Sequence, residues 1–470
     1  MKLKELKRLK NIKNLVLIVF KWKGRQMIKP RVGITTVVMK GFNQDEEDAV
    51  GYQEQLVKVV EKMGFEPVVA PEFIDEYTVA AKNADFFNSK DIDLYILLFG
   101  TFSDDARVMP LITGVNKPMI VWATDYNPFN ISITGSQNVM PNIWDLGIDF
   151  RFIYGDFNDK LALHDLYIFS RACAIKNKLS KTRIGYVGGH ANIMTCQTID
   201  EILVKKIFGT TIVNFGNEDI ILGREKVSKE ETKNLWDEIK SMVGSVKSSD
   251  KNGLMTSSTL IQVLKMIKDN NLQAISINCF PHLKGQVCIP VARLNDLGIP
   301  SACEGDLNST ILMYIMYLLT GKASSNGDQL KVYNLDKPGN SIMFSHCGAG
   351  ALSLTKNKKD IVIHDDYETG KGVAVYFPEN IPGEVTMGGL IGSSGEYRMF
   401  IANGKAVGSN LIKAYEGNPL EVEFPFNVRD MFRQIAYNGF NHHWNIAYGN
   451  LKEELSELCQ LLKINSVIME

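Results

Sequence analysis

Short apolar segments alternate with longer amphipathic segments through the first two thirds of the chain. Three apolar segments rich in β-branched and large aliphatic residues predict buried parallel strands at 31–39, 94–99 and 118–123. The charged, periodic segment 45–63 predicts a helix with one face on the surface. Because strands that alternate with helices form parallel sheets covered on both faces, this part of the chain predicts an α/β domain.

A second alternating unit begins near Thr182. Its predicted strands span 183–187, 210–213, 274–278 and 299–303, and its predicted helices span 192–208, 256–268, 286–297 and 307–319. The last of these helices is apolar on nearly every side, so we expect it to lie buried between two layers. Gly321 follows this helix directly, as is usual where a helix ends. The polar segment 241–252 predicts a surface loop.

From about Ser341 the apolar segments become shorter and glycine becomes frequent, which predicts a β-rich region. Its predicted strands span 373–377, 384–388, 397–402 and 405–407, and its closing helices span 428–437 and 451–462. Asn403 and Gly404 separate the last two strands, and an Asn-Gly pair in that position is a strong signal for a hairpin turn.

The predicted fold class is therefore α/β, with two Rossmann-like parallel-sheet α/β domains followed by a β-rich C-terminal domain. A basic leader is predicted at residues 1–30, and the three domains are predicted at 31–180, 181–335 and 336–470. A chain of 470 residues is too long for a single core, which agrees with several domains.

The formal net charge of −1 hides an uneven distribution. The first 30 residues contain ten Lys or Arg and one Glu, so the remainder contains 42 basic and 52 acidic residues. The apolar run 15–20 in this leader has six residues, whereas a membrane span needs roughly 20. We expect a disordered or loosely attached leader, and a helix on the membrane surface is the alternative. A near-neutral chain has no general attraction to nucleic acid or to anionic membranes.

The seven cysteines are scattered, odd in number and without a Cys-x-x-Cys pair. This pattern suits the reducing cytoplasm and argues against a disulfide scaffold or a structural zinc site. We expect most of the cysteines to be small buried apolar residues, and we expect a cytoplasmic protein.

Two carboxylates lie where a predicted parallel strand ends, the place where open α/β sheets bind ligands. Glu304 and Asp306 follow the strand 299–303 and precede the buried helix. Separated by Gly305, they can face one metal site. The alternative is that Asp306 serves only as the N-cap of the helix, which is worth about 1 kcal/mol.

Histidines form the second group of candidates. Adjacent histidines rarely share one face, so we expect one metal ligand and one substrate-binding or structural residue from His442 and His443, beside Trp444. His282 follows a predicted strand, and His346 lies in a comparable loop. Imidazoles together with carboxylates suit Mn²⁺, Mg²⁺, Co²⁺ or Zn²⁺. The alternative for each histidine is a surface or core position without chemistry.

Three segments resemble the L-fucose/L-arabinose isomerase family. Residues 303–328 combine an acid-Gly-acid start, an apolar helix and a Leu-Thr-Gly end, as in the metal-binding segment of that family. Residues 385–407 resemble its C-terminal β domain, and residues 441–450 resemble its histidine ligand segment. The order of two α/β domains and one β-rich domain agrees along about residues 31–465.

The resemblance implies an aldose–ketose isomerase with a divalent cation, often Mn²⁺, held by two carboxylates and a C-terminal histidine. Carried over, Asp306 is the second carboxylate, with Glu304 beside it as a substitute, and His443 is the histidine ligand. His282 stands where the family has its first carboxylate, a glutamate. We expect His282 to ligate the metal and to move the proton, with Glu304 or Asp306 in support. The residues expected to bind substrate are His442, His346 and Trp444.

Aldose–ketose exchange moves a proton between C1 and C2 through an ene-diol, and a cation at the neighbouring oxygens stabilises the charge that develops there. The family forms trimers or hexamers. The expected partners are therefore a small-molecule sugar and further copies of this chain, with no nucleic acid and no membrane. His282 in place of glutamate leaves two alternatives: a non-catalytic sugar-binding protein, or a metal-dependent lyase or epimerase acting on an acidic or phosphorylated sugar.

Overall fold

The computed structural model describes residues 27–40, 46–124, 126–408 and 417–470. The basic leader predicted at residues 1–30 lies almost wholly outside these described residues. The chain forms two compact units, one over residues 28–178 and one over residues 179–470. Among the helices of the described ranges, none combines the length and the apolar composition that a membrane span requires.

The unit over residues 28–178 is built on a five-stranded parallel sheet in the order β2-β1-β3-β4-β5. Its strands are β1 (Arg31–Val37), β2 (Glu66–Val69), β3 (Leu94–Phe99), β4 (Met119–Ala123) and β5 (Phe150–Tyr154). Its helices are α2 (Glu46–Lys62), α3 (Tyr77–Asn88), α4 (Asp105–Gly114), α5 (Ser132–Asp145) and α6 (Lys160–Ser180). The central strands β3 and β4 are buried at every residue. This burial on both faces explains their continuous apolar sequence and confirms the predicted α/β architecture.

The second unit begins with a four-stranded parallel sheet in the order β10-β9-β6-β7. The strands are β6 (Arg183–Val187), β7 (Thr211–Phe215), β9 (Ala274–Ile277) and β10 (Ser301–Ala302). The helices are α7 (Glu201–Phe208), α8 (Asn217–Arg224), α9 (Lys229–Ser241), α10 (Asp250–Asp269), α11 (Cys288–Asp296) and α12 (Leu307–Thr320). The predicted helix 192–208 was too long, because the Asp200 side chain accepts the amides of Ile202 and Leu203 and so starts the helix at Glu201.

The β-rich part is a closed, mainly antiparallel barrel, in which the pair of β16 and β19 alone among the described strands of this sheet is parallel. The sheet order is β15-β18-β11-β12-β17-β16-β19, and pairing of β15 with β16 closes it. The strands are β11 (Ser325–Tyr333), β12 (Ser341–Ser345), β15 (Gly383–Ser393), β16 (Glu396–Val407), β17 (Leu420–Glu423), β18 (His443–Tyr448) and β19 (Asn465–Met469). Helices α13 (Val428–Tyr437) and α14 (Lys452–Leu462) lie where the sequence predicts them. The barrel begins with β11, before the predicted domain border at residue 335.

The hairpin predicted at Asn403-Gly404 is wrong. Both residues lie inside β16, and the turn between β15 and β16 is at Ser394 and Gly395, which both have positive φ. A Cβ at Gly404 would lie 2.6 Å from Cγ1 of Val422 on the neighbouring strand. The glycine is therefore required by close packing between strands, which the sequence pattern cannot distinguish from a turn.

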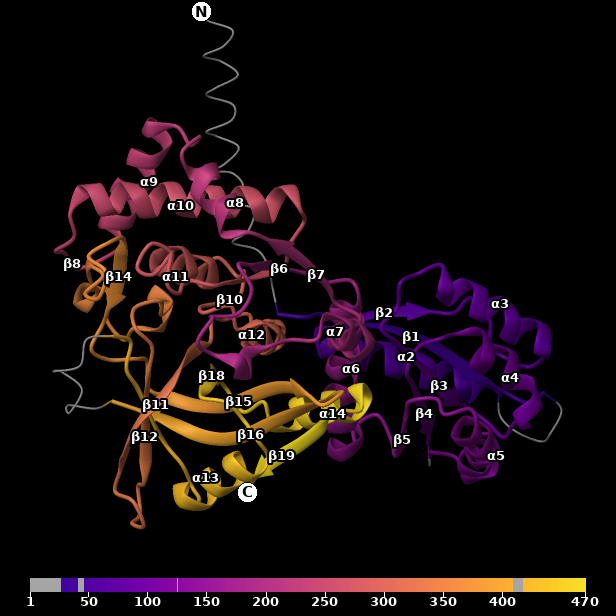
Figure 1. Ribbon diagram of the computed structural model, residues 1–470. Coiled ribbons are helices and arrows are strands. Elements are labelled where there is room, and N and C mark those ends of the chain that lie inside the picture. Colours follow the sequence, from indigo (N-terminus) through magenta and orange to yellow (C-terminus); the bar gives the residue numbers. More distant parts are fainter. Residues whose placement is uncertain (1–26, 41–45, 125, 409–416) are drawn as a thin grey trace, which may run out of the picture. The chain divides into compact units, whose positions relative to one another are not determined.

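A small three-stranded sheet combines one strand from the α/β part with two strands from the β-rich part. It contains β8 (Ser245–Val246), β13 (Val362–Asp365) and β14 (Val373–Tyr376), and β8 comes from the segment where a loop was predicted. Helix α12 packs on β9 and β10 on one side and on β15 and β18 on the other, as Figure 1 shows. Residues 307–319 of α12 are all buried, which confirms the helix between two layers.

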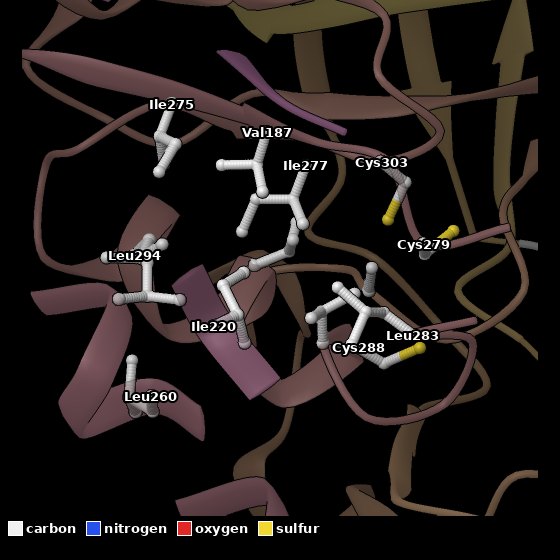
Figure 2. Packing of buried hydrophobic residues seen from close by; sticks show 14 of the residues in the cluster. Val187, Ile220, Leu260, Ile275, Ile277, Cys279, Leu283, Cys288, Leu294 and Cys303 are labelled. Atoms are coloured by element: carbon white, nitrogen blue, oxygen red, sulfur yellow. The ribbon is translucent and has the colours of Figure 1, made fainter. Parts of the chain in front are cut away.

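The core beside the parallel sheet contains aliphatic residues and three cysteines. Figure 2 shows Cys279, Cys288 and Cys303 among the side chains of this cluster, next to Ile277 and Leu283. All three cysteines are at most 4% exposed. The prediction that the cysteines are small buried residues is confirmed for these positions.

Candidate metal centre

The turn between β10 and α12 holds Glu304 in an unusual backbone conformation. Glu304 has φ +60° and Gly305 has φ +70°, both in the left-handed region. A Cβ at Gly305 would lie 2.0 Å from the carbonyl oxygen of Gly189, so that position admits only glycine. Left-handed conformation at a residue other than glycine costs on the order of 1–3 kcal/mol and concentrates at functional sites.

Asp306 caps helix α12 and also contacts His443. It is the N-cap of α12, where its Oδ1 accepts the amide of Ser309 at 2.9 Å. Its Oδ2 lies 2.8 Å from Nδ1 of His443 and also accepts the hydroxyl of Ser309 at 2.8 Å. The cap and the site were alternatives in the sequence, and the structure combines them in one carboxylate that is 1% exposed.

Three neighbouring barrel strands bring the next residues together. In the antiparallel ladders, Asp328 of β11 pairs with His443 of β18 on one side and with Ser345 of β12 on the other. His346 directly follows Ser345. Residues opposite each other on neighbouring strands place their side chains on the same face, so the barrel sets His443 and Asp328 side by side.

Four buried polar atoms converge at this place. Nε2 of His443 lies 3.3 Å from Oε2 of Glu304 and 3.8 Å from Oδ1 of Asp328. Nε2 of His346 lies 3.9 Å from Oε1 of Glu304. Among the described residues, Glu304 Oε2, Asp328 Oδ1 and both Nε2 atoms are buried without a hydrogen bond of good geometry. Each such atom costs about 1–3 kcal/mol unless something else satisfies it.

The electrostatics agree with a site built for positive charge. Burial acts to raise the pKa of Glu304, but pairing with His443 and the charge of His346 lower it to about 2. Burial acts to lower the pKa of His443, but the contacts with Asp306 and Glu304 raise it to about 10. Burial also acts to lower the pKa of His346. The neighbouring Cys347 and the charge of Glu304 outweigh this effect and raise the pKa of His346 to about 9. The contacts with Asp306 and Glu304 therefore favour the protonated form of the His443 imidazole.

The residues present fit a divalent cation. Glu304, His442 and His443 can each offer one ligand atom within 4.8 Å of the others. Carboxylates and imidazoles are suitable donors for Mn²⁺, Co²⁺ or Zn²⁺. His443 would bind through Nε2, because Asp306 occupies Nδ1. A carboxylate behind the ligating imidazole is the usual arrangement that fixes its tautomer and orientation. Asp306 was predicted as a direct ligand, and the structure places it on the other side of the ring.

The remaining predicted residues are spread over the surroundings. His282 is exposed in the loop between β9 and α11, and in the described part of the chain its side chain has no hydrogen bond to Glu304 or His443. His442 is exposed, with its ring centroid 4.2 Å from that of His443. Trp444 points to the other face of β18, where it is 1% exposed in the barrel core. The structure thus gathers Glu304, Asp306, His443 and His346 but leaves His282 and Trp444 outside.

Two residues of the site were missed. Asp328 lies at the edge of the segment that resembles the family, but its role follows only from the strand pairing with β18. Gln197 lies in a 3₁₀ turn, and its Nε2 is 3.2 Å from Nδ1 of His443. No sequence signal marks it, because the turn was predicted as part of a helix.

Comparison with known proteins bears on the same part of the chain. A family model described as the L-fucose isomerase C-terminal domain matches residues 340–470, which include His346 and His443. A sulfoquinovose isomerase from Priestia aryabhattai is 23% identical over 412 residues, which are 85% of this chain and 91% of that protein. These matches support the resemblance of the chain to the L-fucose/L-arabinose isomerase family.

Other relatives in the isomerase family agree along most of their length. A sulfoquinovose isomerase from Alkalicoccus urumqiensis is 21% identical and covers 92% of this chain and 98% of its own. An L-arabinose isomerase from Shouchella clausii is 21% identical and covers 88% of each chain. The names of these relatives support the predicted class of enzyme, an aldose–ketose isomerase.

Proposed function

We propose that this protein is a divalent-metal-dependent aldose–ketose isomerase that works through an ene-diol. The observation that carries the proposal is the convergence of Glu304, Asp328, His346 and His443 through buried atoms that lack hydrogen bonds. A single cation would satisfy the atoms of Glu304, Asp328 and His443, a sugar oxygen would satisfy Nε2 of His346, and the relatives named above are sugar isomerases.

In this proposal Glu304 and His443 hold the cation, and Asp328 and His442 are the nearest further donors. The bound cation would act as a Lewis acid on two neighbouring sugar oxygens. Asp306 keeps the proton of His443 on Nδ1, which leaves Nε2 free to coordinate. Nε2 of His346 is positioned to donate a hydrogen bond to a sugar oxygen. Glu304 is the carboxylate at the centre of the site and is the candidate that moves the proton.

The substrate class follows from the relatives. Three relatives that are matched over at least 90% of their own length carry the name sulfoquinovose isomerase, so we propose a sulfonated aldose as the substrate. L-Arabinose and L-fucose are the second choices, from the other relative and the family model. The cytoplasmic location and the trimer or hexamer expected from the family stay predictions.

The test begins with protein stripped of metal by a chelator and then supplied with Mn²⁺, Mg²⁺, Co²⁺ or Zn²⁺. Sulfoquinovose, L-arabinose and L-fucose are each incubated in D₂O, and products are followed by NMR. We expect a ketose to form only with metal, with deuterium from the solvent at C1, because an ene-diol exchanges its proton with water. Glu304→Gln should abolish turnover, since it removes the central charge but keeps the shape of the side chain.

His282 decides between the proposal and its alternative, a non-catalytic sugar-binding protein. An active protein whose rate is unchanged in His282→Ala would agree with the exposed position of this side chain. Turnover that appears only in His282→Glu would identify a chain that binds sugar and has lost the reaction. Turnover without any metal would contradict the proposal itself.

A further inference from the structure

The segment that follows β6 contacts both the α/β side and the barrel side of the candidate metal centre. It spans residues 188–197 and ends in a 3₁₀ turn over Thr195–Gln197. One of its contacts is with Glu304, in the turn between β10 and α12, and another is with His443, at the start of β18. The segment therefore links two candidate metal ligands that different parts of the fold provide.

The beginning of the 188–197 segment is fixed to the parallel sheet. The side chain that fixes it belongs to Asn278, which follows β9 and is 3% exposed. Its Nδ2 donates to the carbonyl oxygens of Gly188 at 3.1 Å and His190 at 3.0 Å, and its Oδ1 accepts the amide of Phe280 at 3.1 Å. Because both ends of this side-chain amide are hydrogen-bonded within the fold, the turn after β6 is held in one position.

The middle of the segment is hydrogen-bonded to the Glu304 turn. The amide of Ala191 donates to the carbonyl oxygen of Glu304 at 3.0 Å. The amide of Met194 then donates to the carbonyl oxygen of Ala191 at 2.9 Å, and the amide of Gln197 donates to that of Met194 at 3.0 Å. These two bonds fold residues 191–197 into consecutive tight turns, so the position of the Gln197 side chain is set relative to the backbone of Glu304.

The Gln197 side chain makes the contact with His443. Gln197 is 1% exposed, and its Nε2 lies 3.2 Å from Nδ1 of His443. Nδ1 also lies 2.8 Å from Oδ2 of Asp306, and an ionised carboxylate can only accept, so the hydrogen between these two atoms belongs to Nδ1. The two ends of a side-chain amide have nearly the same shape, and a half turn of the Gln197 amide brings Oε1 to Nδ1 as a second acceptor.

We propose that Gln197 is a positioning residue for His443, whose Nδ1 hydrogen its amide oxygen shares with Asp306. The inference rests on the proposed metal-dependent function. With one acceptor, the imidazole ring can still swing about that hydrogen bond. A second acceptor from another segment limits this swing and keeps Nε2 of His443 directed at Glu304, which lies 3.3 Å away. Because the same segment also binds the backbone of Glu304, it holds the two donors at a fixed spacing.

The other end of the Gln197 amide is left for a hydroxyl. After the half turn, Nε2 occupies the buried place where Oε1 has no hydrogen bond among the described residues. Buried amide hydrogens without an acceptor are unfavourable, so we expect an oxygen atom to lie there. A water and a sugar hydroxyl can both supply it, and kinetics distinguish them: Gln197→Met should raise the KM for the sugar if the oxygen belongs to the sugar, and leave KM unchanged if it belongs to a water.

The experiment compares wild type, Gln197→Met and the control Thr195→Val as full chains. Methionine keeps the length of the side chain without the amide, and Thr195 is an exposed residue of the same 3₁₀ turn. In the metal-free protein, hydrogen exchange of peptides that cover residues 188–197 should be about fivefold faster in Gln197→Met, because one hydrogen bond that holds the segment is lost. Calorimetric titration should show about tenfold weaker Mn²⁺ binding, the lower end of the effect of residues behind ligating histidines. Thr195→Val should match wild type in both measurements.

A merely structural role would leave the geometry of the bound metal unchanged. With Co²⁺ bound, the visible absorption band reports the ligand geometry, and it should shift in Gln197→Met but not in Thr195→Val. Gln197→Ala, which removes the whole amide, should repeat these losses and replaces Gln197→Met if that variant does not fold. Hydrogen exchange equal to that of wild type, or equal losses in Thr195→Val, would overturn the proposal. A protein without turnover that still shows the exchange and binding differences would refute the isomerase function and leave the role of Gln197 standing.

Discussion

The role of Asp306 gives the sharpest test of the site, because its two oxygens can be changed separately. In Asp306→Asn the amide oxygen can still accept the amide of Ser309, and asparagine is as good an N-cap as aspartate. The amide NH₂ then faces Nδ1 of His443, where the carboxylate was 2.8 Å away. Nδ1 must become the acceptor, so the proton of the neutral ring moves to Nε2 and blocks the nitrogen that would bind metal.

The expected loss of metal affinity in Asp306→Asn follows from this move of the His443 proton. Carboxylates behind ligating histidines typically contribute 10–100-fold to metal affinity, which corresponds to about 1.4–2.7 kcal/mol at 1.36 kcal/mol for each factor of ten. A charge-assisted hydrogen bond of this kind is worth about 1.5–3 kcal/mol, so the two figures agree. Thermal unfolding of the metal-free protein should change far less than in Asp306→Ala, which also loses the cap.

The assay is calorimetric titration of chelator-treated protein with Mn²⁺, in wild type, Asp306→Asn and the control Ser309→Ala. The control loses the hydroxyl contact to Oδ2 of Asp306 but keeps the capping amide and the contact with His443, so its affinity should change less than threefold. Unchanged affinity in Asp306→Asn would refute the positioning role. A loss beyond about a thousandfold would favour Asp306 as a direct ligand, as the sequence predicts.

Three further predictions concern the same centre. Because the pKa of His443 is raised to about 10, Mn²⁺ binding must displace a proton from this ring, and Mn²⁺ affinity should rise about tenfold per pH unit from pH 6.5 to 8.5. The raised pKa also stabilises the fold of the metal-free protein. This stabilisation is complete below about pH 6.5 and is lost as the pH rises toward 10. Asp328→Asn should weaken Mn²⁺ binding about tenfold in calorimetry without lowering the metal-free melting temperature, since Oδ1 has no hydrogen bond to lose; a lower melting temperature would contradict this. Gly305→Ala should destabilise the fold in urea by more than about 3 kcal/mol through its clash with Gly189, whereas Gly370→Ala, at a similar φ with open space around it, should cost about 1 kcal/mol.

The sequence predicts the elements well where one physical signal dominates. Helix α12 is apolar on all sides, and β3 and β4 are short and apolar, so each can be predicted as an element buried on all sides. The prediction fails where two explanations share one pattern. Gly404 marks close packing between strands instead of a turn, and Asp200 starts α7 after a segment whose periodicity resembles a helix.

The candidate site divides in the same way. Glu304 and Asp306 are visible in the sequence because they follow a strand and precede a helix. Asp328 becomes part of the site only through its register with His443, which depends on how distant strands pair. The face of β18 also decides between His443 and Trp444, because successive residues of a strand point to opposite sides. His282 follows a strand as expected, but the loop carries its side chain into the solvent.

The barrel has a consequence for which ions the protein can accept. Asp328 and His443 are carried by adjacent strands, and His346 follows the third, so their mutual spacing is inherited from the inter-strand repeat of about 4.8 Å. The strands β11, β12 and β18 belong to the ring that the pairing of β15 with β16 closes, and a closed ring resists changes in that repeat. Glu304 comes instead from a turn of the α/β part, and it is the donor able to shift when ionic radius changes. Discrimination between a small cation such as Mg²⁺ and a larger one such as Mn²⁺ should therefore depend on the geometry of that single turn.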